Sequence, residues 1–253
     1  MLKKRGQVST FVIIGVLVLF VFIFVFMLRD SIREKFRGTV DREGYLISQM
    51  NQIKKTINTC LVKETDKAVK LLGESGGYFN PEDYVTYHGT KIAKLCENIP
   101  QEKICNAKPL SIENTNKVLK NYLQTEIKNC IDLNPYRKKD YTLEAGELNL
   151  DVSIKETEII TQLNYPITLK LDNTEVKNEE IINNVKMPLG KAIQLTNTIL
   201  SEEAITGNFD VMTMSLLSKG EYTIRERKSY PNKFYMIDYN GLYKFNIGIE
   251  GEA

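Results

Sequence analysis

The sequence predicts an α+β fold with an N-terminal transmembrane helix, a disulfide-linked helical layer and an antiparallel sheet with helix cover. Three observations support this prediction: an unbroken apolar run at residues 11–28, four cysteines within residues 60–130, and strand-like alternation after residue 135. The expected segments are a leader at 1–6, a transmembrane helix with its basic flank at 7–37, a Cys-containing helical subdomain with a short hairpin at 38–138, and a β-rich α+β subdomain at 139–253.

The apolar run Phe11–Leu28 has no polar side chain, and sixteen of its eighteen residues are Leu, Ile, Val or Phe. A helix of this length spans about 27 Å, close to the roughly 30 Å hydrocarbon core of a bilayer. The run is followed by charged residues rather than by the small residues of a signal-peptidase site. We therefore expect the helix to be retained and to contact the lipid bilayer.

The charge of the chain is uneven. Residues 1–37 hold seven Lys or Arg and two acidic residues, whereas the remainder holds 27 basic and 30 acidic residues. Nucleic-acid binding needs clustered positive charge, so we expect no nucleic-acid partner. Basic residues flank both ends of the apolar run, and the positive-inside count alone therefore leaves the orientation open.

The residues before the run, Lys3–Ser9, read KKRGQVS. This stretch, followed by an apolar helix, resembles the class III signal of archaeal type IV pilin-like proteins. The resemblance implies cleavage between Gly6 and Gln7, a cytoplasmic N-terminus and a body outside the cytoplasm. Pilins usually carry Glu at the fifth residue of the mature chain, where this chain has Phe11. The resemblance therefore supports cleavage of the leader more than it supports assembly into a filament.

A second resemblance lies in the loop Gly73–Tyr78, GESGGY, which follows a predicted helix. The loop lacks the Gly-Lys-Ser/Thr sequence of a phosphate-binding loop, so we interpret it as a turn that ends the helix. It also resembles a loop that follows a Cys-containing helix in uncharacterised archaeal single-pass membrane proteins. That resemblance implies no activity.

The four cysteines are Cys60, Cys96, Cys105 and Cys130. An even number beyond a membrane anchor predicts two disulfides in an oxidising compartment. We favour Cys60–Cys130, on the apolar faces of two predicted helices, and Cys96–Cys105, on either side of a Pro-containing loop. Four free thiols in a cytoplasmic domain and a zinc site are the alternatives, although no CxxC pair is present.

The first half of the outer part is predicted to be mainly helical. Apolar residues recur at three- and four-residue steps over Asp41–Leu72. Gly89-Thr90 joins two short alternating segments and predicts a hairpin. Ser111 is the expected N-cap of a second helix.

The second half, after a boundary near Pro135–Asp140, is predicted to be β-rich. One helix is expected over residues 188–204, with Pro188 at its start, and Asn240-Gly241 predicts a hairpin. The expected strands are residues 148–155, 158–164, 166–172, 221–228, 233–239 and 242–250.

No group of residues predicts catalysis. The single histidine, His88, has no GxSxG nucleophile to serve, and it remains only a candidate pocket residue. The adjacent acids Glu179-Glu180 and Glu202-Glu203 are interpreted as solvated ends of elements. We therefore expect no enzyme activity, no cofactor and no metal site, and we assign no catalytic, cofactor-binding or metal residue.

These observations favour a single-pass membrane protein that acts as a cell-surface or envelope interaction component, with a protein partner in the envelope. One alternative is a pilin-like subunit of an archaeal surface filament. Another is a membrane-tethered enzyme or ligand-binding domain, which would need a pocket around His88 or in the β-rich half.

Overall fold

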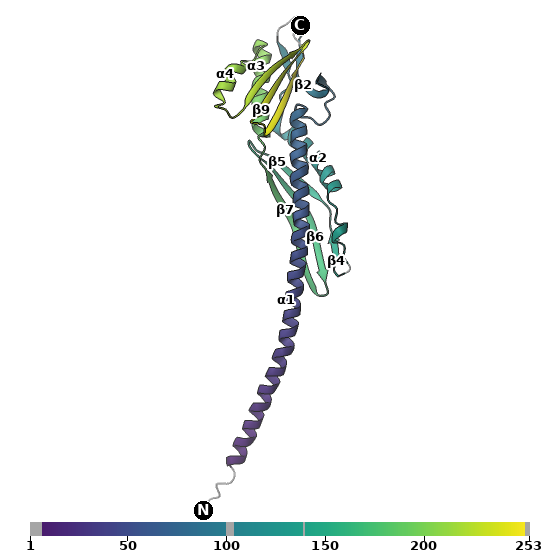
Figure 1. Cartoon of the computed structure of the whole chain (residues 1–253), viewed down its shortest axis with the longest axis vertical. Helices are drawn as coiled ribbons and strands as arrows, with labels where there is room; N and C mark the ends of the chain where they lie inside the picture. The colour runs from purple at the N-terminus through teal and green to yellow at the C-terminus, as the bar shows by residue number, and fades with distance from the viewer. Residues whose placement is uncertain (1–6, 100–103, 139, 251–253) are drawn as a thin grey trace, which may run out of the picture.

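The computed structural model describes residues 7–99, 104–138 and 140–250, and of residues 7–13 and 25–40 only the backbone. One helix, α1 (Gln7–Glu74, 68 residues), extends from the N-terminal end into the body, and the other elements surround its C-terminal part (Figure 1). At about 1.5 Å per residue, α1 is about 100 Å long. The apolar run and the helix expected at 41–72 are therefore parts of one helix. The leader expected at 1–6 lies outside the described residues.

The first sheet is antiparallel and is built around one long strand, β6. One edge of β6 pairs with β7 along almost its whole length, whereas the other edge pairs with β5 near the start of β6 and with β4 near its end. The strands are β4 (Thr142–Ala145), β5 (Asn149–Ile154), β6 (Ile159–Leu171) and β7 (Thr174–Val185).

Two features of this sheet differ from the sequence prediction. The strands expected at 158–164 and 166–172 form the single strand β6, whose register shifts between Asn164 and Ile167. This irregularity accommodates Pro166, which has no N–H to donate to the ladder. The strands β4 and β7 were not expected, and β7 carries four charged residues and three asparagines, a composition poor in strand formers.

The second sheet has the order β1-β2-β10-β9-β8, with β3 paired to β2. Its strands are β1 (Tyr84–Tyr87), β2 (Thr90–Asn98), β3 (Cys105–Ala107), β8 (Thr223–Ser229), β9 (Asn232–Tyr239) and β10 (Tyr243–Ile249). The hairpins expected at Gly89-Thr90 and at Asn240-Gly241 are confirmed.

The antiparallel sheet expected from the sequence is confirmed for the first sheet, whereas this second sheet is mixed. The strands β10 and β2 pair in parallel. Parallel pairing needs a long crossover connection, and the chain between these two strands is long enough to provide one. Gly248 permits the close approach, since a Cβ there would lie 2.4 Å from Val85 Cγ2 and 2.8 Å from the Ala93 carbonyl. Strands from both sides of the boundary expected at Pro135–Asp140 share this sheet, and that boundary remains a prediction.

The described residues form three further helices and one 3₁₀ turn: α2 (Ile112–Cys130), η1 (Asn134–Tyr136), α3 (Leu189–Thr206) and α4 (Val211–Leu217). Ser111 caps α2 as predicted, because its side chain accepts a hydrogen bond from the Asn114 backbone N–H. The helix expected at 188–204 is α3, whereas α4 was not expected. Asp210 caps α4 by accepting from Thr213 N.

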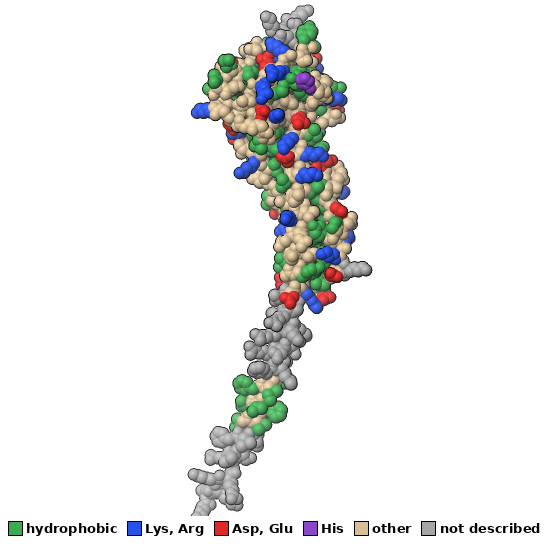
Figure 2. Space-filling view, in the orientation of Figure 1, with side chains coloured by type: hydrophobic (Ala, Val, Ile, Leu, Met, Phe, Trp, Pro, Cys, Tyr) green, Lys and Arg blue, Asp and Glu red, His purple; other side chains and the backbone are tan. Residues whose placement is uncertain are grey.

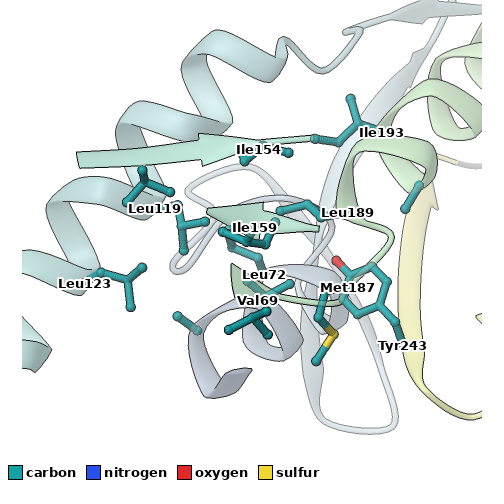
Figure 3. Packing of buried hydrophobic residues seen from close by; sticks show 14 of the residues in the cluster. Val69, Leu72, Leu119, Leu123, Ile154, Ile159, Met187, Leu189, Ile193 and Tyr243 are labelled. Carbon is teal, nitrogen blue, oxygen red and sulfur yellow. The ribbon is translucent and has the colours of Figure 1, made fainter. Parts of the chain in front are cut away.

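One hydrophobic core joins both sheets to the helices. Figure 3 shows where the elements meet: Val69 and Leu72 of α1 lie near Leu119 of α2, Ile159 of β6 and Leu189 of α3. Both disulfides reinforce this arrangement. Cys60–Cys130 links α1 to α2, and Cys96–Cys105 links β2 to β3. The α+β class and the two disulfides are therefore confirmed, in the pairing that the sequence favours.

Candidate functional site

The N-terminal part of α1 presents apolar side chains on all its sides. Within Ile14–Phe24, the large apolar side chains are 47–66% exposed, and they form the green band on the helix below the body (Figure 2). Consecutive residues point to all sides of a helix, so the body covers no face of this segment. The side chains of Phe11–Ile13 and Val25–Leu28, the remainder of the predicted run, lie outside the described set.

In the part of the chain that the structure describes, no helix is both long and apolar enough to cross a membrane.

The body begins about 20 Å along α1 from the end of the apolar run, if the helix rises about 1.5 Å per residue from Leu28 to Arg42. Arg42 pairs at 2.9 Å with Asp172 in the turn between β6 and β7. Beyond it, Leu46, Met50 and Ile53 are buried in the core. The part of α1 from Leu46 onward is therefore packed into the body, whereas the apolar segment projects away from it.

A pocket of about 340 Å³ lies beside the loop that follows α1. Its lining residues are Tyr78, Asn80, Pro81, Glu82, Asp83, Ala93, Lys94, Leu95 and Lys108. Asp83 lies 3.0 Å from Lys94 and 2.8 Å from Lys108, and hydrogen bonds from Lys108 and Lys94 hold the pKa of the Asp83 carboxyl below its usual range. These oppositely charged groups neutralise one another and stabilise the junction between the β1–β2 hairpin and the chain after β3.

His88 lies in the turn of the β1–β2 hairpin, with a positive φ of 47°. Its ring is exposed and packs edge-on against Tyr87, with 4.2 Å between the ring centroids. His88 is not among the residues that line the pocket. Across residues 7–99, 104–138 and 140–250, no group of three or more His, Cys, Asp or Glu is arranged to hold a metal ion.

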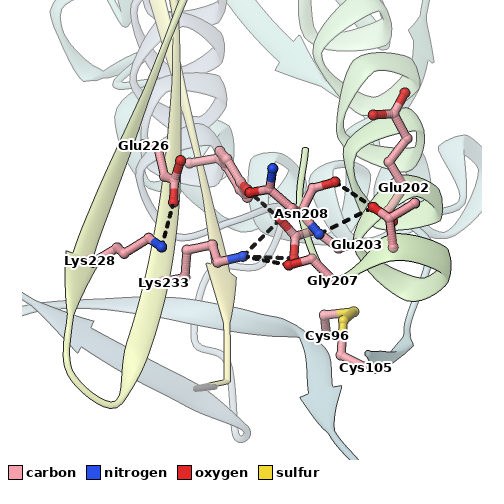
Figure 4. A network of polar contacts seen from close by, with 11 residues as sticks. Cys96, Cys105, Glu202, Glu203, Gly207, Asn208, Glu226, Lys228 and Lys233 are labelled. Atoms are coloured by element: carbon pink, nitrogen blue, oxygen red, sulfur yellow. Dashed lines mark hydrogen bonds and ion pairs between the residues drawn. A yellow bond between two sulfur atoms is a disulfide. The ribbon is translucent and has the colours of Figure 1, made fainter. Parts of the chain in front are cut away.

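A buried ion pair connects α3 to β9, and it corrects one interpretation made from the sequence. Glu203 is not a solvated helix end, because it is 2% exposed and accepts hydrogen bonds from Lys233 Nζ at 2.9 and 3.1 Å (Figure 4). Lys233 Nζ also donates to the Gly207 carbonyl at 3.1 Å, so all three of its protons are used. The Tyr235 hydroxyl donates to Glu203 as well, and burial raises the pKa of Tyr235.

The sequence did hold a signal for this cluster. Glu203 continues the stripe Leu189, Ile193, Thr196 and Leu200 at three- and four-residue steps along α3, so it lies on the buried face of the helix. Lys233 and Tyr235 are two residues apart in β9 and therefore share a face of the sheet. The cluster is fully hydrogen-bonded, which is typical of a structural ion pair.

Sequence reasoning missed four exposed apolar side chains near the C-terminal half of the helical cover. They are Ile205 at the end of α3 and Met212, Leu216 and Leu217 of α4, each 66–75% exposed. In contrast, Val211 and Met214 of the same short helix pack against the core. The segment VMTMSLL is apolar around most of its circumference, and this is the signal that could have revealed an exposed apolar face.

Comparisons with known proteins give no match: no protein-family model, no curated protein and no solved structure matches the chain.

Proposed function

We propose that the protein is a single-pass membrane protein that holds a disulfide-linked body outside the cytoplasm and acts as a surface or envelope interaction component. The observation that carries this proposal is the continuity of α1. The same helix that presents exposed apolar side chains at Ile14–Phe24 is packed into the core of the body from Leu46 onward. Any surface that binds the apolar segment therefore also fixes the position of the body.

Transfer free energies support a lipid environment for this segment. Leu, Ile, Val and Phe each contribute about −0.3 to −0.6 kcal/mol near the centre of an inserted helix, so the run Phe11–Leu28 contributes about −5 to −10 kcal/mol. The two disulfides support an oxidising location for the body, because cytosolic thiols are generally kept reduced. The basic residues before the run, together with the class III resemblance, support a cytoplasmic N-terminus.

Introducing two arginines, Val18→Arg and Phe20→Arg, is expected to move the full-length protein from the membrane fraction to the alkaline-wash supernatant. Each arginine near the centre of the helix adds about 2.5–3.5 kcal/mol to the insertion free energy, and the pair offsets most of the contribution of the run. The matched control is Ile182→Arg with Leu242→Arg, two apolar residues of the body that are 61% and 55% exposed. If this control variant also moved to the alkaline-wash supernatant, the result would contradict anchoring through α1.

The orientation is tested on intact cells with a membrane-impermeant amine reagent. We expect exposed lysines of the body, such as Lys63 and Lys177, to be labelled without lysis. Labelling of these lysines only after lysis would show that the body faces the cytoplasm.

The second candidate is a filament subunit, in which the exposed apolar part of α1 packs against the same segment of other copies. The observation that favours it is the exposure of Ile14–Phe24 on all sides of the helix, because a helix apolar all round suits the interior of a helix bundle as well as lipid. Negative-stain microscopy of envelope fractions, with the body tagged, separates the two functions. Tagged filaments would favour the second.

A further inference from the structure

The second sheet lies at the end of the body away from the apolar segment of α1, and β8 forms one edge of it (Figure 1). One side of β8 pairs with β9 over residues 223–229. Among the described residues, no strand pairs with the other side of β8, and the neighbouring helix α4 makes no backbone hydrogen bond to it. The N–H and C=O groups on that side of β8 are therefore available to a further strand.

Two arginines of β8 lie on the face of this sheet that is turned away from the main core. Side chains alternate along a strand, and Ile224 belongs to the main core, so Arg225 and Arg227 lie on the opposite face. The pairing with β9 agrees with this placement, because Arg227 lies opposite Phe234, which belongs to a separate small cluster with Val85. The two arginine side chains leave the backbone about 7 Å apart.

Both arginines are exposed, and neither makes an ion pair or a hydrogen bond with another residue of the described chain. In contrast, the other basic residues of the β8–β9 hairpin are paired. Lys228 lies 3.7 Å from Glu226, and Lys233 lies 2.9 Å from Glu203 (Figure 4). Lys and Arg side chains gather on the visible face of this end of the body (Figure 2). Because a guanidinium group matches the geometry of a carboxylate, two unpaired arginines on one strand favour a ligand with two carboxylates.

We propose that the unpaired edge of β8 binds an extended, acidic segment of another protein, which joins the sheet as an additional strand. Every second side chain of such a strand lies on the face of Arg225 and Arg227, with about 5 Å between the Cβ atoms of directly opposite residues. The matching segment carries Asp or Glu at alternate positions, because one carboxylate then pairs with each guanidinium. This inference names a partner class for the interaction role proposed above and rests on that role, whereas the binding itself does not require a membrane.

The test uses the full-length chain in a non-ionic detergent and a fluorescein-labelled peptide of alternating Thr and Glu, as long as β8. Fluorescence anisotropy at low salt measures the dissociation constant of the peptide. Arg225→Gln with Arg227→Gln is expected to raise this constant about three- to thirty-fold, because two exposed ion pairs are lost. The matched control, Lys117→Gln with Lys128→Gln, removes two exposed charges of α2 and is expected to leave the constant unchanged. A peptide that does not bind, or that binds the arginine variant as tightly as the natural chain, would overturn the proposal.

Modified peptides test whether the ligand joins the sheet as a strand. A peptide of the same composition with its glutamates in one block lacks the alternation and is expected to bind more weakly. In an added strand, alternate N–H groups point toward β8 and the others point away from it. Of two peptides, one N-methylated at its inner threonines and one at its glutamates, only one should therefore lose binding. Equal affinities of the block and alternating peptides, or equal effects of the two methylation patterns, would overturn strand addition.

The outcome is separable from that of the membrane proposal, because the peptide is bound by the chain in detergent. Failure of the protein to remain in the membrane fraction would not alter peptide binding. Loss of peptide binding would overturn only the partner class, and anchoring through α1 would stand.

Discussion

Replacing Glu203 with leucine is expected to destabilise the protein by about 3–5 kcal/mol, because the charged Lys233 would remain buried with only the Gly207 carbonyl as acceptor. The penalty arises from the uncompensated charge rather than from lost packing, since Glu and Leu differ little in volume. The measurement is the free energy of unfolding of the full chain in detergent, from denaturant titration. Glu202→Leu, at the half-buried neighbour in the same turn of α3, is the matched control and should change this free energy by about 0.5 kcal/mol or less.

The double variant Glu203→Leu with Lys233→Met separates the effect of the uncompensated charge from the effect of lost packing. It removes both charges, so it should be more stable than Glu203→Leu alone by at least about 1 kcal/mol. It should still be less stable than the natural protein, because the Tyr235 hydroxyl and the Gly207 carbonyl lose their partners. The single variant Lys233→Met completes the comparison. If the stability losses of Glu203→Leu and Lys233→Met sum to the loss of the double variant, the two residues stabilise the fold independently and the ion pair is not the relevant interaction.

Local sequence predicts the elements that have their own capping residue, apolar stripe or turn residues. The helix α2 has its capping serine and a regular apolar stripe, and the β9–β10 hairpin has Asn240-Gly241 in its turn, where both residues take a positive φ. In contrast, β7 is charged and polar along most of its length. It forms because it pairs with β6 and because α1 packs on its buried face at Ile181 and Val185. Pairing between distant segments leaves little trace in local composition.

The candidate sites also differ in whether local sequence reveals them. The apolar run was evident because eighteen consecutive residues lack a polar side chain. The pair of Glu203 and Lys233 was not, because each residue alone is more often solvated, and only the contact between α3 and β9 makes both buried. The mixed sheet was also beyond prediction, because the parallel pairing of β2 and β10 depends on how the chain returns to the first half.

Reduction of the disulfides is expected to lower the free energy of unfolding most strongly through Cys60–Cys130. In the loop-entropy model, a cross-link between residues 70 apart stabilises the folded state by about 4 kcal/mol, whereas one between residues 9 apart contributes about 2.5 kcal/mol. The difference arises in the unfolded chain, where the longer loop loses more conformational freedom. Denaturant titration of the full chain, before and after treatment with a reductant, measures the combined loss.

Paired alanine substitutions distinguish the two cross-links. Cys60→Ala with Cys130→Ala should cost more stability than Cys96→Ala with Cys105→Ala, although Cys96 and Cys105 are both buried and the other pair includes the half-buried Cys130. A model based on burial alone predicts the opposite order, because it assigns the larger loss to the more buried pair. The opposite order would therefore show that packing around the sulfurs, rather than the constraint between α1 and α2, determines the contribution of these cysteines. The predicted order would mean that the covalent link to α2 is what secures α1 in the body.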